Sequence, residues 1–143
     1  MRRLIASASI VALSLTAATA AAGATKARCG AGAVKGIAWV TGGPKGVGSL
    51  TGTFTSAASM FGYRWNCSGG TVSVRKPDTP PEGFDVSFAG NPGHVAIASA
   101  AGGPAAAAVT RNADGSFHVS IAGDTAGQSF KTRSDTAFVI IVF

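Results

Sequence analysis

The sequence predicts an all-β protein in which two antiparallel sheets pack face to face as a sandwich. Apolar and polar residues alternate with a period of two from residue 33 onward, which is the pattern of strands with one face in a core. Glycine, proline, asparagine and aspartate separate these segments at short, regular intervals. No segment after residue 33 combines a helical apolar stripe with capping residues.

The first 24 residues differ from the rest and are predicted to be a secretory signal peptide. Two arginines near the start precede an apolar run over residues 4–18, and small residues follow up to Ala24. We expect cleavage near Ala24, which leaves residues 25–143 as one secreted domain, extracellular or associated with the cell envelope. The run is too short to span a bilayer comfortably as a helix, so stable membrane insertion is not expected.

The composition fits one small, weakly charged domain. The 143 residues include 20 glycines, and 13% of them are charged, against about 25% in typical globular proteins. The formal charge of +6 falls to +4 when Arg2 and Arg3 leave with the signal peptide. A chain of this length supports a single hydrophobic core and is too short for a two-domain enzyme.

Cys29 and Cys67 are the two cysteines of the chain. Cysteines of an exported protein meet an oxidising environment, so we expect them to form one disulfide. They lack the C-x-x-C spacing of metal-binding or redox pairs, and a structural bridge is therefore predicted.

Alternation and turn residues together predict about nine strands. The final segment is apolar on both faces, which indicates a central strand. Residues 112–115 form a predicted hairpin loop, with Gly115 in the left-handed conformation. The predicted strands span residues 33–41, 49–55, 61–67, 71–76, 84–89, 94–100, 105–111, 116–122 and 136–143.

A seven-residue sequence occurs twice and supports the two-sheet architecture. Residues 84–90 (FDVSFAG) and 117–123 (FHVSIAG) are identical at five of seven positions. Each copy follows a predicted strand that ends in arginine, at Arg75 and Arg111, and then a turn with glycine. We therefore expect one hairpin to be built twice. Its aromatic and valine side chains face one way and need a second sheet to cover them.

Short strands at this spacing are typical of sandwiches with jelly-roll or immunoglobulin-like topology. The glycine-led hairpins with their aromatic-x-V pattern, together with the aromatic-rich last strand, resemble the trimeric jelly rolls of the C1q and tumour-necrosis-factor type. The resemblance covers short segments only and carries no residue role to this chain. The sequence is compatible with a homo-oligomer.

Motifs for chemistry are few. Residues 41–48 match the T-G-x-x-x-G-x-G dinucleotide loop, but a strand-like segment follows where that loop needs a helix. Asp85, His118 and a serine could form a hydrolytic triad, yet no G-x-S-x-G motif supports one, and His118 is expected to be solvated beside Ser120. Asp78, Glu82 and Asp85 are too few for a hard-metal site. We predict no catalytic residue, no metal and no cofactor.

Charge is distributed unevenly along the chain. Residues 25–76 carry seven basic residues and no acid, whereas residues 77–143 carry three basic residues and six acids. The halves either neutralise each other or leave a basic face for an anionic envelope polymer or an acidic protein. Arg64 is expected on the polar face of its strand, opposite Tyr63 and Trp65. The candidate binding residues are Lys35, Lys45, Arg64, Arg75 and Lys76.

These observations predict a secreted protein without catalytic activity that binds a partner or belongs to the cell envelope. Nucleic acid is not an expected partner of an exported chain. The alternative is a protease inhibitor with a rigid exposed loop over residues 77–83 or 42–48, or a small hydrolase. A hydrolase requires a serine, a histidine and an acid to meet in a cleft.

Overall fold

The computed structural model describes residues 29–30, 32–79, 82–101, 105–125, 128–132 and 136–143, with backbone alone for 124–125 and 128–132. The predicted signal peptide, residues 1–24, lies outside the described residues. Within the described residues, nine strands form two antiparallel sheets, as predicted. The strands are β1 (Gly36–Val40), β2 (Phe61–Asn66), β3 (Val72–Arg75), β4 (Phe84–Phe88), β5 (Ala96–Ala101), β6 (Ala105–Arg111), β7 (Phe117–Thr125), β8 (Gln128–Thr132) and β9 (Ala137–Val142).

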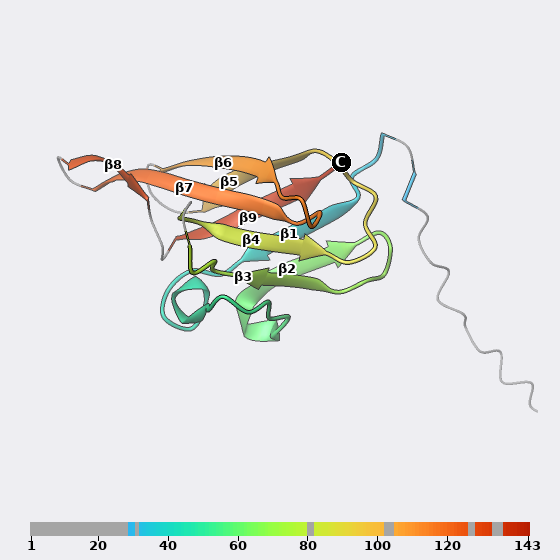
Figure 1. The fold of residues 1–143 in the computed structure, drawn as a ribbon, viewed down its shortest axis with the longest axis horizontal. Coiled ribbons are helices and arrows are strands. Elements are labelled where there is room, and N and C mark those ends of the chain that lie inside the picture. The colour runs from blue at the N-terminus through green and yellow to red at the C-terminus, as the bar shows by residue number, and fades with distance from the viewer. Residues whose placement is uncertain (1–28, 31, 80–81, 102–104, 126–127, 133–135) are drawn as a thin grey trace, which may run out of the picture.

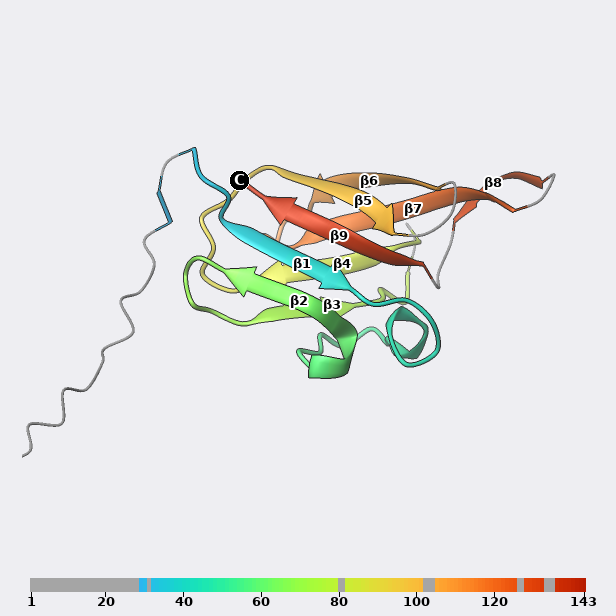
Figure 2. The ribbon, with the colours of Figure 1, turned by 180° about the vertical axis from the view of Figure 1, so that it is seen from behind.

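The two sheets form the two layers of a sandwich (Figures 1 and 2). One sheet, which we call sheet A, has the order β2-β1-β9-β5. Sheet B has the order β3-β4-β7-β6, and β8 extends it by pairing with β7. The apolar final strand β9 lies between β1 and β5, which confirms its predicted central position.

The core lies between the sheets and consists of alternate residues from each strand. Ala38, Val40, Phe138 and Ile140 of sheet A are fully buried. From sheet B, the aromatic and aliphatic positions of both seven-residue copies enter the same core: Phe84, Val86, Phe88, Phe117, Val119 and Ile121. The rings of Phe84 and Phe138 stack at a centroid distance of 5.3 Å. The two layers are therefore joined by direct aromatic contact.

The repeated hairpin is confirmed, and both copies lie in sheet B. Strand β3 pairs with β4, and β6 pairs with β7, each antiparallel. Gly115 in the β6–β7 turn has a φ of 85°, the predicted left-handed conformation. The second strands of the two hairpins, β4 and β7, pair with each other.

Two strand predictions were wrong. Residues 49–55 contain the end of a short 3-10 helix, η1 (Val47–Ser49), and a single bridge between Thr55 and Val74. The backbone around Gly52 approaches Asp78 so closely that a Cβ would collide with its carboxylate, and this close contact replaces regular pairing. A second 3-10 helix, η2 (Ala58–Met60), leads into β2. Strand β8 was missed because its sequence, QSFKT, lacks apolar alternation.

A disulfide between Cys29 and Cys67 joins the segment before β1 to the turn after β2, as predicted. No cysteine among the described residues is free. Within that part of the chain, no helix has the length and apolar character needed to cross a membrane.

Candidate functional site

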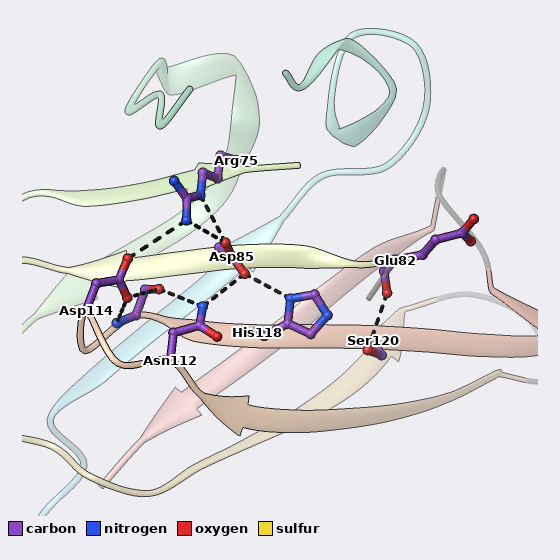
Figure 3. Close-up of polar contacts among 8 residues, drawn as sticks. Arg75, Glu82, Asp85, Asn112, Asp114, His118 and Ser120 are labelled. Atoms are coloured by element: carbon purple, nitrogen blue, oxygen red, sulfur yellow. Dashed lines mark hydrogen bonds and ion pairs between the residues drawn. The ribbon is translucent and has the colours of Figure 1, made fainter. Parts of the chain in front are cut away.

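A row of polar side chains crosses the outer face of sheet B. The strand register places Arg75 on β3, Asp85 on β4, His118 on β7 and Thr110 on β6 beside one another in turn. His118 Nδ1 lies 2.9 Å from Asp85 Oδ1, and Arg75 Nε donates to Asp85 Oδ2 at 2.9 Å. Figure 3 shows Asp85 between these two partners. The buried carboxylate thus forms an ion pair with the Arg75 guanidinium on one side and contacts the His118 imidazole on the other.

The β6–β7 turn adds a second layer of hydrogen bonds to this row. Asn112 Nδ2 donates to Asp85 Oδ1 at 3.1 Å and to Ser116 Oγ at 2.9 Å. The backbone N–H and the hydroxyl of Ser116 both donate to Asp114 Oδ1, at 2.9 and 2.6 Å. These bonds to the Ser116 hydroxyl and backbone lower the pKa of Asp114 below its ordinary value of 3.8. The turn is therefore held by side chains as well as by backbone pairing.

His118 is buried, so the prediction of a solvated histidine was wrong. Its exposed fraction is 6%, although it lies on the outward face of its strand. The backbone of Gly83 covers the ring so closely that a Cβ there would lie 2.7 Å from His118 Nε2. A glycine at this position allows the covering segment to lie directly on the imidazole.

The arrangement of Asp85 and His118 resembles two members of a hydrolytic triad without the third. Asp85 orients Nδ1, and the buried Nε2 has no hydrogen-bond partner. The side of the ring with Nε2 is turned toward Glu82 and Ser120 (Figure 3). The Ser120 hydroxyl, however, donates to the Glu82 carbonyl at 3.4 Å. Within the described residues, no serine hydroxyl is bonded to Nε2.

A cavity of about 400 Å³ lies beside this polar row. Its charged side chains already compensate one another, since Arg75 forms ion pairs with Asp85 and, at 3.8 Å, with Asp114. No group of three or more His, Cys, Asp or Glu side chains among the described residues could hold a metal ion. The lining residues are Arg75, Pro77, Thr79, Asp85, Thr110, Asn112, Ala113, Asp114 and His118.

The outer face of sheet A has the opposite character. Every large hydrophobic side chain that is exposed among the described residues lies on sheet A or within two residues of one of its strands. In the register, Tyr63, Trp39 and Val139 form one row, and Trp65, Ile37 and Ile141 form the next. The exposed side chains are Val34, Trp39, Tyr63, Trp65, Val95, Ile97 and Phe143.

Three aromatic side chains at the β1–β2 end of this face form what we call the aromatic strip: Trp39, Tyr63 and Trp65. Their exposed fractions are 46%, 54% and 36%. A Cβ on Gly62 would lie 2.7 Å from the Trp39 ring, so the indole lies across the glycine backbone of the neighbouring strand. A bulge between Trp39 and Val40 creates this arrangement.

The polar face of β2 was assigned incorrectly from the sequence. Tyr63 and Trp65 do lie opposite Arg64, but the aromatic residues face outward, whereas Arg64 shares the inner face with Asn66, which is 8% exposed. The reason is that β2 is an edge strand, where the inner side opens to solvent and accepts a long cationic side chain.

The five basic candidates lie on several elements: Lys35 before β1, Lys45 in the loop after β1, Arg64 on β2, and Arg75 and Lys76 at the end of β3 and directly after it. Arg75 is ion-paired in sheet B, and Lys76 follows it, with its backbone N–H bonded to the Thr51 carbonyl. Lys45 is exposed in the loop after β1. Lys35 and Arg64 are close to the aromatic strip in the register, since the Lys35 carbonyl accepts from the Cys67 backbone and Arg64 pairs with Ala38.

The chain matches no family model, no curated protein and no solved structure. The two outer faces of the sandwich are therefore the candidate functional surfaces. Sequence reasoning missed the aromatic strip as a surface. The sequence feature that could have indicated this surface is Gly62, which lies between two aromatic residues. A glycine on a strand leaves room for an aromatic ring from the neighbouring strand.

Proposed function

We propose that this chain is an exported binding protein without catalytic activity, and that it holds a polysaccharide against the aromatic strip of sheet A. The observation that carries the proposal is the asymmetry of the two outer faces. Exposed large apolar side chains are confined to sheet A and its flanks within the described residues. Such a concentration is typical of interaction surfaces rather than of ordinary surface.

Aromatic side chains with one free face suit a sugar ring. Sugar rings present C–H groups on their faces, and these pack on the electron-rich face of an indole or phenol ring. The Trp39 indole lies against the Gly62 backbone, which supports the ring on one side. Tyr63 and Trp65 continue the platform on β2. A polymer lying along these rings would contact several sugar units at once.

The predicted export of the protein is compatible with this role. The Cys29–Cys67 disulfide fits an oxidising compartment, where envelope and extracellular polysaccharides are found. The side chains of the polar row of sheet B are paired with one another, and the row contributes to the stability of the scaffold in this proposal.

Binding to insoluble polysaccharides tests the proposal. We expect the secreted protein to sediment with at least one of cellulose, chitin, peptidoglycan and a pectate gel. Trp39→Ala and Tyr63→Ala should each reduce the bound fraction. Ile97→Ser is the matched control, because Ile97 is 55% exposed on the same face but lies on the far strand β5. Failure to bind any of the four polymers would overturn the proposal.

A second copy of the chain is the main competing occupant of this face. In that case analytical ultracentrifugation would show an oligomer, and Ile97→Ser would dissociate it as effectively as Trp39→Ala. A hydrolytic role would appear instead as soluble sugar released from the bound polymer, with the release lost in His118→Gln. Either result would contradict a monomeric binding protein without catalytic activity.

A further inference from the structure

A groove of about 440 Å³ opens at the edge of the sandwich beside the aromatic strip. It lies between the edge strands of the two sheets, β2 and β3, and Trp65 belongs both to the strip and to the groove. Its volume is within the range of small-ligand sites. The groove is lined by Ser56, Arg64, Trp65, Asn66, Gly69, Gly70, Thr71 and Val72.

Arg64 is the cation of this groove, and its head group is already positioned. Arg64 Nη1 donates to the Ser56 carbonyl at 2.5 Å, and the guanidinium carbon lies 4.9 Å from the centre of the Phe61 ring. Its other nitrogens, Nε and Nη2, have no hydrogen-bond partner among the described residues. These two nitrogens form the fork with which arginine binds a carboxylate through two parallel hydrogen bonds.

No acid neutralises Arg64 within the described part of the chain. The groove lining contains no aspartate or glutamate. Arg75 differs from Arg64 because an acid compensates its charge. Asp85 Oδ2 accepts from Arg75 Nε and lies 2.9 Å from Arg75 Nη2. Of these two arginines on the edge strands, only Arg64 presents an uncompensated charge to a ligand.

The floor of the groove is rigid. Asn66 Nδ2 donates to the Gly70 and Ala89 carbonyls at 3.1 and 3.0 Å, and its Oδ1 accepts from Asn91 Nδ2 at 3.0 Å. The neighbouring Cys67 is fixed by the disulfide. Thr71 is exposed at the rim, and its hydroxyl has no hydrogen-bond partner among the described residues. A bound group therefore meets a preorganised surface.

We propose that this groove binds the carboxylate of an acidic sugar, so that the polysaccharide held by the aromatic strip contains hexuronic acid units. This inference rests on the proposed function. A hexuronate unit in the groove would place its carboxylate against Nε and Nη2 of Arg64, while a neighbouring unit of the same polymer stacks on the outward-facing ring of Trp65. Charge complementarity selects an acidic over a neutral sugar.

Titration calorimetry with a matched pair of soluble probes tests the inference. The probes are an oligogalacturonate and its methyl ester, which have the same sugar units but carry charged carboxylates in one case and neutral methyl esters in the other. The wild-type protein should bind the acid roughly tenfold or more tightly than the ester, the size expected for a charge-assisted hydrogen-bonded pair. Arg64→Gln should abolish this preference. Arg64→Lys should keep only part of it, because lysine retains the charge but loses the fork.

The controls separate this inference from the proposed function. Arg111→Gln removes an exposed cation on β6, outside the groove lining, and should leave the preference unchanged, whereas Trp65→Ala should weaken the binding of both probes. Equal binding of acid and ester by wild-type protein, or an undiminished preference in Arg64→Gln, would overturn the carboxylate site and leave polysaccharide binding intact. Binding of neither probe, together with no sedimentation on any polymer, would overturn both. Circular dichroism confirms that each variant is folded.

Discussion

Asp85 and His118 occupy the same position of the two seven-residue copies and face each other across β4 and β7, with Nδ1 and Oδ1 2.9 Å apart. The two copies pair antiparallel, and the register has Phe84 opposite Val119 and Val86 opposite Phe117. The second position of the copies is thus the centre of a local twofold arrangement. The two copies differ at this position, which places a carboxylate on one strand and an imidazole on the other.

Loss of this pair should destabilise the fold. Asp85→Asn removes the carboxylate that pairs with Arg75 and contacts His118. We expect a loss of about 2 kcal/mol in the free energy of unfolding. This is less than for a fully buried pair, because the Arg75 side chain is 31% exposed. Urea denaturation at neutral pH measures the change.

A double-mutant cycle with His118→Asn tests whether the two residues act together. We expect a coupling energy of roughly 1 kcal/mol between the two substitutions. Ser73→Ala is the control, since Ser73 is half-buried in the same sheet and pairs with Ser87; it should change stability little. Strictly additive effects of Asp85→Asn and His118→Asn would contradict direct coupling.

The hydrogen bonds from Ser116 to Asp114 predict a stability change in acid. They lower the pKa of Asp114 below 3.8 in the folded protein. A carboxylate with a lowered pKa stabilises the fold at pH values above 3.8, and this contribution is lost as the pH falls through the lowered value. Asp114→Asn should therefore lower the urea midpoint at about pH 6, and the difference should be smaller at about pH 2.

Ser116→Ala provides the companion measurement. It removes the hydroxyl that donates to Asp114 Oδ1 at 2.6 Å, so the pKa of Asp114 should move back toward its ordinary value. The pH dependence that Asp114→Asn abolishes should be weaker in this variant. Equal midpoint differences at both pH values for Asp114→Asn would show that the charge of Asp114 is not the cause.

The sandwich itself could be predicted because its signals are local. Phe84, Val86, Phe117 and Val119 alternate with polar residues and all four enter the core. Alternation reports which side chains share a face, and the need to bury them then requires a second sheet. The two cysteines paired as expected from export alone.

The two outer faces could not be predicted, because alternation does not say what covers the other side of a strand. His118 was expected in solvent, but the backbone of Gly83 lies over it. Trp65 alternates with Asn66 like a core residue, yet Asn66 is the buried one. Strand β2 is an edge strand, and on such a strand tertiary contacts decide which face is exposed to solvent.

Gly62 should matter for binding more than for stability. Gly62→Ala places a Cβ 2.7 Å from the Trp39 ring, so the indole must move away from the strand. Because Trp39 is 46% exposed, the ring can move at a cost below about 1 kcal/mol. We expect polysaccharide affinity to fall about tenfold, as in Trp39→Ala.

Tryptophan fluorescence reports this movement directly. The chain has two tryptophans, so a Trp65→Phe background isolates the emission of Trp39. Gly62→Ala should shift that emission, whereas Gly30→Ala, where a Cβ would meet nothing within 4 Å, should not. Unchanged emission together with unchanged binding would show that the support of Trp39 by Gly62 is unimportant.

The disulfide should contribute much of the stability of this small domain. Cys29 and Cys67 are 38 residues apart in sequence, and closing a loop of this length restricts the unfolded chain by roughly 4 kcal/mol. The double variant Cys29→Ser with Cys67→Ser should lose about that amount in urea denaturation. Its far-ultraviolet circular dichroism in water should still show strands, because the core lies between the sheets and does not include the bridge.

Reduction of the wild-type protein gives an independent measure of the same quantity. Wild-type protein in excess dithiothreitol should unfold at the urea midpoint of the double variant, since both lack the covalent constraint. When the reductant is removed and the disulfide forms again, the wild-type protein should regain its original urea midpoint. A loss below about 1 kcal/mol in both cases would contradict a stabilising bridge. Two free thiols titrated in protein collected from the medium would contradict the predicted oxidised, exported form.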